Sequence, residues 1–173
     1  MIIESLHNIE TIENEEFFLK CGNPCTRIAR LTKGVMRGFV TDNDGNEITT
    51  HFYQEGDMVI GSYIPNANAP VSVQALEECE VLMADYSEVM SHLNKDQDIT
   101  EVIALAFRKL NIQLQSRLVA LQNLDSLEKY ELFLKEYPKL INRIPHYYIA
   151  SFLGITPTQL SRARKQLINK CKR

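Results

Sequence analysis

Residues 150–167 read ASFLGITPTQLSRARKQL, and this stretch decides the fold of the C-terminal part of the chain. It begins with a helical apolar pattern, breaks at Gly154, and begins again behind Thr156 and Pro157. Glycine readily adopts the positive φ that ends a helix. Thr156 can cap a new helix, Pro157 suits its first turn, and Gln159 can reach back to the cap. The stretch therefore predicts two short helices that meet at a tight turn.

The second predicted helix has two different faces. Its apolar face consists of Leu160, Ala163 and Leu167. Hydroxyl, amide and cationic groups lie opposite, on Thr158, Ser161, Arg162, Lys165 and Asn169. Recognition of the DNA major groove uses such groups, because arginine bonds guanine, hydroxyls contact bases or phosphate, and lysine contacts phosphate. The pattern predicts a DNA-binding helix-turn-helix. A plain helical hairpin is the alternative, but it does not explain the six basic residues that follow from Arg162 onward.

The charge distribution agrees with a basic C-terminal module. The whole chain of 173 residues has a net charge of −3. Residues 1–122 carry 9 basic and 18 acidic residues, whereas residues 123–173 carry 10 basic and 4 acidic residues. Such asymmetry between halves is typical of a basic interaction module behind an acidic one.

The region from Phe17 to Ala84 shows the pattern of short strands separated by turns. Lys33 and Gly34 mark one turn, and the segment TDNDGNE at 41–47 is a strong hairpin signal. The segment QEGD at 54–57 marks a further turn, with MVIGSY after it. Strands spaced by 8–12 residues predict a small sandwich or barrel.

From about Asp98 the apolar period becomes helical and predicts a helix of about 23 residues. One stripe on it holds the candidate dimer residues, which are Ile99, Val102, Ile103, Ala106, Leu110 and Leu121. A second stripe holds Leu105, Ile112 and Val119, and Arg117 interrupts the first. Because a surface helix needs only one apolar face, two faces predict two neighbours: the chain's own β-domain and the same helix of a second subunit. A monomer with this helix buried between two domains is the alternative.

A third helix is predicted to begin near Asp125, because Asp125 and Glu128 have capping-box spacing, and to end near Pro138.

The remaining signals mostly exclude other functions. The cysteines Cys21, Cys25, Cys79 and Cys171 contain no C-x-x-C pair, and the histidines form no ligand pair, so no metal site is expected. The acidic start lacks the features of a secretory signal, and no apolar run is long enough for a membrane span, so we expect a cytoplasmic protein.

With these elements in place, the chain resembles the Crp/Fnr family of bacterial transcription regulators. It is most similar to Bacteroidetes-type members, which end in stretches like IASFLGITPTQLSRARKQL at 149–167. The segments KGVMRGFVTDNDGNEITTHFYQEGDMVIGSY at 33–63 and SVQALEECEVL at 72–82 are similar to the family's cyclic-nucleotide-binding β-roll. The resemblance implies an α+β chain with a β-roll sensor of jelly-roll type, a long dimerisation helix and a C-terminal helix-turn-helix of winged-helix type.

The chain departs from the family pattern in the phosphate cassette. Members that bind cyclic AMP carry a Gly-Glu pair and an Arg-Ser pair there, with arginine against the phosphate and glutamate against the ribose. Here Ser62 follows Gly61, and no cation stands near Ala69 and Pro70. We expect no cyclic AMP binding, or only weak binding, and no cofactor. The candidate effector pocket is Gly61, Ser62, Val71 and Ser72. The cysteines also lack the pattern of an iron–sulfur cluster, the start looks short of the family's leading helix, and the wing is expected to be reduced or absent.

The sequence thus predicts three parts: a sensor domain at 1–97, a dimerisation helix at 98–122 and a DNA-binding domain at 123–173. The predicted partners are double-stranded DNA with a palindromic operator, a second copy of the chain and RNA polymerase, without a membrane. By resemblance the DNA-binding residues are Thr156, Pro157, Thr158, Gln159, Ser161, Arg162 and Lys165. The rival hypothesis is a small-molecule-binding β-barrel or cupin-like enzyme with an incidental basic tail. His51 is the one histidine of the predicted strand region, which argues against a cupin-like metal site and for a protein that is not an enzyme.

Overall fold

The computed structural model describes residues 8–62, 64–93 and 95–171. The expectation about the family's leading helix falls on residues 1–7, and the last two basic residues are 172–173, so both lie outside the described residues. The chain divides into two compact units, one that ends at Lys109 and one that begins at Leu110. A long helix, α3 (Gln97–Asn123), belongs to the first unit at its start and to the second at its end.

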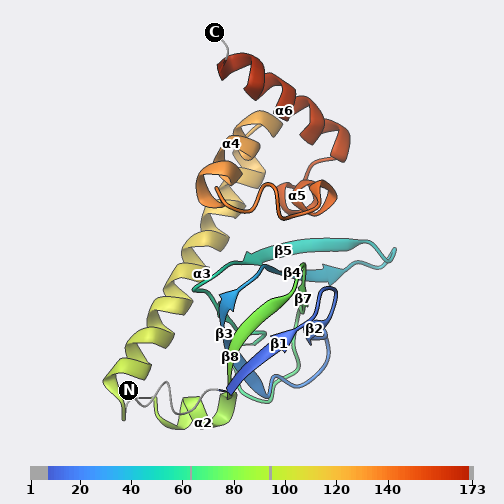
Figure 1. The fold of residues 1–173 in the computed structure, drawn as a ribbon. Helices are drawn as coiled ribbons and strands as arrows, with labels where there is room; N and C mark the ends of the chain where they lie inside the picture. The colour runs from blue at the N-terminus through green and yellow to red at the C-terminus, as the bar shows by residue number, and fades with distance from the viewer. Residues whose placement is uncertain (1–7, 63, 94, 172–173) are drawn as a thin grey trace. The chain divides into compact units, whose positions relative to one another are not determined.

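The first unit is built from two antiparallel sheets. Its strands in the described residues are β1 (Asn8–Ile12), β2 (Phe17–Leu19), β3 (Arg27–Lys33), β4 (Met36–Thr41), β5 (Glu47–Tyr53), β6 (Met58–Val59), β7 (Ser72–Ala75) and β8 (Cys79–Asp85). One sheet has the order β1-β8-β3-β6 and the other β2-β7-β4-β5. Figure 1 shows β1, β3 and β8 side by side. Strands from the beginning and the end of the unit alternate within each sheet, which is the double-sheet arrangement of a jelly roll.

Two of the predicted turns are confirmed in their backbone geometry. Gly34, between β3 and β4, has φ +104°, and a Cβ there would lie 2.5 Å from Cys79 Sγ and 2.9 Å from the Glu78 carbonyl oxygen. In the β4–β5 turn Gly45 has φ +85°, and the Asp42 carboxylate accepts the Asn46 backbone N–H at 2.8 Å. Residues other than glycine rarely adopt these φ values. This is why glycine at these positions in the sequence identifies the hairpin turns.

Three elements of the first unit differ from the sequence prediction. Strand β1 was not predicted, because only Ile12 of its five residues is buried and the alternating pattern is missing. It forms by pairing with β8, about 70 residues later in the chain. Helix α2 (Tyr86–Ser91) is a short helix capped by the Asp85 side chain and was also not predicted. Strand β6 is only two residues long, so Ile60, Gly61 and Ser62 of the MVIGSY segment are not in a strand.

Two hydrophobic clusters hold the first unit together. The first lies between the sheets and includes Leu31, Met36, Val73 and Val81, all fully buried. The second is formed by Cys25, Ile28, Ala69, Ala84, Tyr86, Val89, Ile99 and Ile103. Because this second cluster contains residues of α3, the first turns of α3 are part of the core of the β-unit. A β-rich unit followed by helices confirms the predicted α+β class.

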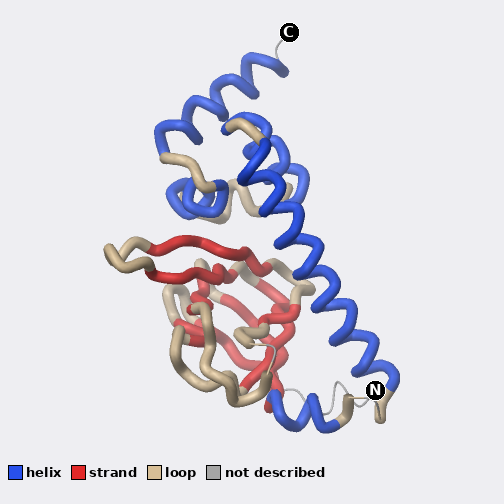
Figure 2. The backbone as a smooth tube through the Cα atoms, turned by 180° about the vertical axis from the view of Figure 1, so that it is seen from behind, coloured by secondary structure: helices blue, strands red, loops and turns tan. Residues whose placement is uncertain are grey.

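The second unit is helical. It contains the end of α3 and the helices α4 (Ser126–Glu136), α5 (His146–Leu153) and α6 (Pro157–Cys171), which Figure 2 draws in blue. The predicted capping box at the start of α4 is confirmed, since Asp125 accepts the Glu128 N–H at 2.9 Å and Glu128 accepts the Asp125 N–H at 2.9 Å. An aromatic cluster forms its core, with ring centroids of Phe133, Tyr137 and Phe152 between 5.3 and 6.0 Å apart.

Candidate functional site

Helices α5 and α6 meet at Gly154, as the sequence predicts. Gly154 has φ +62° in the left-handed region. Its N–H donates to the Ser151 carbonyl at 3.2 Å, and the Ile155 N–H donates to the Ala150 carbonyl at 3.1 Å. These two bonds form a Schellman motif, which satisfies two of the carbonyls at the end of α5. A Cβ at position 154 would also lie 2.8 Å from Leu121 Cδ2 of α3, so the corner has little room for a side chain.

The start of α6 is fixed by a reciprocal cap between Thr156 and Gln159. Thr156 Oγ1 accepts the Gln159 N–H at 3.2 Å, and Gln159 Oε1 accepts the Thr156 N–H at 2.8 Å. The predicted capping box is therefore confirmed. In this cap the Gln159 side-chain oxygen accepts a hydrogen bond from the backbone of its own chain, although the Gln159 side chain is exposed.

The two faces of α6 are separated as the sequence predicts. Leu160 and Ala163 are buried against the other helices of the unit. All seven candidate DNA-binding residues are exposed, namely Thr156, Pro157, Thr158, Gln159, Ser161, Arg162 and Lys165. The outward face of α6 thus combines two cations with hydroxyl groups, and Arg162 and Lys165 lie three residues apart on it.

A second arginine of α6 is turned away from this face. Arg164 Nη1 contacts the ring nitrogens of His146, at the start of α5, at 3.0 and 2.8 Å. Burial, and then the nearby Arg164 charge, lower the pKa of His146. The neutral imidazole can accept a hydrogen bond from the guanidinium. Arg164 therefore links α6 to α5, whereas Arg162 faces outward.

The structure divides the six candidate dimer residues of α3 between different environments. Ile99 and Ile103 are only 2% and 4% exposed, because they pack in the second cluster of their own β-unit. Ala106 and Leu110 are half-buried, and Val102 and Leu121 are exposed. The second apolar stripe is exposed along its whole length, with Leu105, Ile112 and Val119 at 53%, 55% and 58%. The second stripe is therefore one exposed apolar surface of α3, and Leu114 and Leu118 are exposed outside it.

An ion pair that the sequence did not reveal joins α3 to the β-unit. Lys109 Nζ forms a salt bridge with the Asp57 carboxylate in the turn between β5 and β6. The Asp57 side chain is 7% exposed and that of Lys109 is 52% exposed. Asp57 also accepts the Gln54 N–H at 3.0 Å. No local pattern could have predicted this pair, because its members are 52 residues apart.

The four candidate effector residues lie around segment 19–25, which fills the space beside them. A Cβ at Gly61 would lie 1.8 Å from Leu19 Cδ2 and 3.1 Å from Cys25 Sγ. The Ser72 hydroxyl accepts the Cys21 N–H at 3.0 Å, and Val71 packs against the first cluster. The Ser62 carbonyl accepts the Tyr86 hydroxyl at 3.0 Å. These residues are therefore engaged in packing and hydrogen bonds of the β-unit itself.

The loop that would correspond to the phosphate cassette is paired along its backbone with the same segment. Cys25 and Ala67 are joined by one N–H to carbonyl bond, Asn66 and Cys25 by another, each of 2.9 Å, and Ala69 bonds Asn23 at 2.8 Å. Ala69, near the place where the family's arginine is expected, is 3% exposed. Burial raises the pKa of the Cys25 thiol, which keeps it protonated. The loop is closed by small apolar side chains rather than lined by charged groups.

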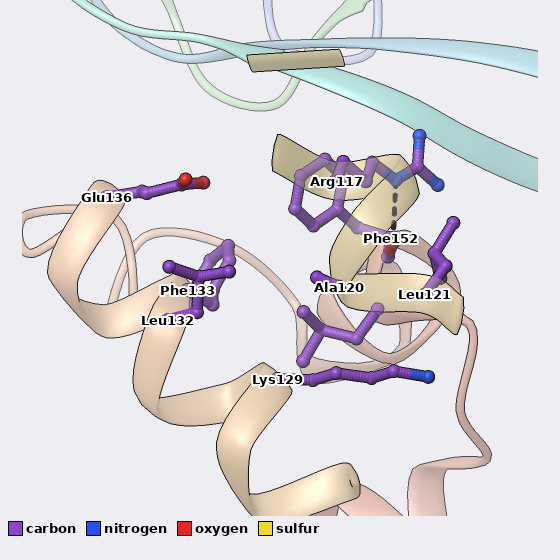
Figure 3. A pocket seen from close by; sticks show the side chains of 9 residues that line it. Arg117, Ala120, Leu121, Lys129, Leu132, Phe133, Glu136 and Phe152 are labelled. Carbon is purple, nitrogen blue, oxygen red and sulfur yellow. Dashed lines mark hydrogen bonds between the residues drawn. The ribbon is translucent and has the colours of Figure 1, made fainter. Parts of the chain in front are cut away.

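A small cleft lies in the second unit between the end of α3, α4 and α5, and Figure 3 shows the side chains that line it. Its volume is about 20 Å³, which is room for about one water molecule. A cleft of this size is too small for the ligands that proteins usually bind in pockets. Arg117 borders it, with Nε donating to the Phe152 carbonyl at 3.1 Å.

Within residues 8–62, 64–93 and 95–171, no three or more His, Cys, Asp or Glu side chains gather as metal ligands would. Nor does any described helix combine the length and the hydropathy that crossing a membrane requires.

Comparison with known proteins relates the chain to one sequence family and to several solved structures. The family model of the cyclic nucleotide-binding domain matches residues 9–96. FixK2 from Bradyrhizobium japonicum superposes with a TM-score of 0.85 at 16% identity, covering 95% of this chain and 85% of that one. The c-di-GMP-responsive global regulator CLP from Xanthomonas campestris superposes with a TM-score of 0.77 at 16% identity, covering 96% of this chain and 89% of that one. A CRP-family transcriptional regulator from Thermus thermophilus superposes with a TM-score of 0.74 at 17% identity, covering 93% of this chain and 85% of that one. At these identities the likeness is one of fold. No curated protein sequence matches the chain.

Proposed function

The chain belongs to the cyclic nucleotide-binding domain family, and from this premise we propose that it is a homodimeric, sequence-specific DNA-binding transcription regulator of the Crp/Fnr type, with the Bacteroidetes-type C-terminal helices. In this proposal residues 1–97 form the sensor domain, 98–122 the dimerisation helix and 123–173 the DNA-binding domain. The protein binds a palindromic operator and acts on transcription with RNA polymerase. It has no catalytic role.

The observation that carries the proposal is the exposed cationic face of α6 behind the Gly154 corner. A helix-turn-helix places the first turns of its second helix in the major groove. In α6, Thr158, Ser161 and Arg162 are exposed and would lie against base edges, while Lys165 would contact phosphate. The side-chain oxygen of Gln159 caps the helix, so Gln159 contributes to DNA only through its amide N–H groups. Thr156 and Pro157 set the entry of the helix into the groove.

The proposed dimer forms along the exposed stripe of α3. Leu105, Ile112 and Val119 are spaced by seven residues, so they occupy one position of a heptad, and Val102 is three residues before Leu105. A seven-residue repeat supports a left-handed coiled coil of two parallel helices. Ala106, Leu110 and Leu121 lie on the other apolar stripe of α3 and not in this seam. Two copies would then present their α6 helices to major grooves about 34 Å apart.

The direct experiment is selection of duplexes from a random pool, followed by titration of the selected site at several salt concentrations. A dimeric regulator selects a palindrome, and the logarithm of its binding constant falls steeply with the logarithm of salt concentration. Absence of duplex binding at low salt would refute the proposal and favour a small-molecule-binding protein. A selected site without two-fold symmetry would refute the dimer.

Replacing Arg162 with alanine is expected to weaken binding to the selected site by about 1–3 kcal/mol and to relax the preference at one base pair. The reason is that an exposed arginine at this position loses a bidentate bond to a base. Lys165→Ala is the matched control, because a lost phosphate contact weakens all sequences alike and lowers the salt slope by about one. Fluorescence anisotropy with the selected duplex and with a scrambled duplex distinguishes the loss of a base contact from the loss of a phosphate contact. Equal losses for Arg162→Ala on both duplexes would contradict base recognition.

We also propose that the β-roll does not bind cyclic AMP. Leu19 and Cys25 occupy the space beside Gly61, and buried Ala69 offers no charge for a phosphate. Calorimetric titration with cyclic AMP up to about 1 mM is expected to give no binding heat, which limits any affinity to weaker than about 4 kcal/mol. The double variant S62E/A69R, which restores the family's charges, is expected to lose stability without gaining affinity, because its arginine enters a closed loop. Saturable binding by the wild-type chain would contradict this proposal.

A further inference from the structure

We propose that Arg117 of α3 is the positioning residue for the corner between α5 and α6, so that the end of α3 and the recognition helix move as one body. Arg117 Nε donates to the Phe152 carbonyl at 3.1 Å, and its guanidinium carbon lies 4.6 Å from the centroid of the Phe152 ring. Figure 3 shows Arg117 and Phe152 close together, with the hydrogen bond between them dashed. One arginine thus holds both the backbone and the side chain of a residue two positions before Gly154.

The Phe152 carbonyl belongs to the last turn of α5. The last four carbonyls of an α-helix accept no hydrogen bond from an N–H of the same helix, and the negative end of the helix dipole lies there. A cation near that end is favourable. Helix α5 has no basic residue in its own last turn, so the charge comes from Arg117 on another helix. The contact is therefore specific to the position at which α5 ends and the turn begins.

Neighbouring residues of α3 support the same attachment. Leu121 lies against Gly154, and Ala120 is 7% exposed. The Ser116 hydroxyl donates to the Glu136 carboxylate of α4 at 3.1 Å. These contacts of α3 lie within a single compact unit that begins at Leu110. These contacts attach the end of α3 to α4 and to the corner after α5.

The effect of Arg117 on DNA binding rests on the proposed function. In a dimeric regulator, a change in how the two α3 helices pair would pass through Arg117 and Leu121 to the Gly154 corner and then to α6. Arg117 itself is half-buried and bonded within its own chain, so it acts through Phe152 rather than by touching DNA. The effect on DNA affinity would then be one of geometry and not of charge.

The test compares Arg117→Met with Arg117→Lys and with the matched control Arg108→Met, which removes the same charge from an exposed position of α3. The first readout is amide hydrogen exchange of the full chain without DNA. Arg117→Met is expected to speed exchange at Gly154 and Ile155 about tenfold, while amides in α4 and in the sheets stay unchanged. Arg117→Lys, which keeps a cation and a donor, is expected to recover part of the protection, and Arg108→Met to change nothing.

The second readout is binding to the selected duplex over a range of salt concentrations. Arg117→Met is expected to weaken binding about tenfold with the salt slope unchanged, because no phosphate contact is lost. Unchanged exchange at Gly154 and Ile155, equal acceleration throughout α4–α6, or a salt slope lowered by about one would each overturn the inference. If the wild-type chain binds no duplex, the proposed function fails, and the exchange data still decide the role of Arg117.

Discussion

Ile112→Glu is expected to convert the dimer into a monomer and to weaken binding to a palindromic duplex by at least about a hundredfold. Ile112 is the middle residue of the exposed stripe formed with Leu105 and Val119. In a two-stranded coil the two copies of this residue face each other, so the variant places two carboxylates in one layer. Burying like charges without partners costs several kcal/mol, and the monomer loses the second half-site.

Analytical ultracentrifugation measures the dimer, and anisotropy measures the affinity for the duplex. Asn111→Glu is the matched control, since it adds the same charge at an exposed position outside the stripe. It is expected to leave both quantities near their wild-type values. A variant Ile112→Glu that remains dimeric would show that the chains pair through another surface, such as the one that includes Leu121.

Lys109→Ala is expected to lower the free energy of unfolding by about 1–3 kcal/mol, a larger loss than its half-exposed side chain suggests. The reason is an asymmetry in the ion pair. Asp57 is buried and Lys109 is half-exposed, so removing the lysine leaves a buried carboxylate without its counter-charge. The Gln54 N–H still bonds Asp57, which limits the loss. Arg108→Ala, one residue earlier and exposed, is expected to cost much less.

Urea unfolding at one fixed chain concentration measures these differences, since the stability of a dimer depends on concentration. The double variant D57N/K109A is the decisive comparison. Asparagine keeps the shape of the aspartate but carries no charge, so the double variant is expected to recover part of the loss. If Lys109→Ala and Arg108→Ala cost the same, the ion pair contributes nothing to holding α3 on the β-unit.

The features that the sequence predicted correctly are local in the chain. The Gly154 corner, the Thr156–Gln159 cap and the Asp125–Glu128 cap each join residues no more than a few positions apart. Their geometry depends on φ angles and on side chains that reach their own backbone, so residue types at fixed spacing suffice to predict them. The glycine turns of the sheets follow for the same reason. The buried and exposed faces of α6 follow from its helical period.

The sequence was therefore enough to predict where α4 and α5 begin and end, where α6 begins, which hairpins turn, and which face of α6 is cationic. The tertiary structure alone decided which apolar stripe of α3 packs on the β-unit, because helical period shows two faces but not their neighbours. It also decided that Leu19 fills the space beside Gly61, that Lys109 pairs with Asp57 and that Arg117 holds Phe152. Each of these contacts joins residues at least 35 positions apart. Such contacts form only when the chain is folded, since burial and distance between remote side chains depend on the packing of every element between them.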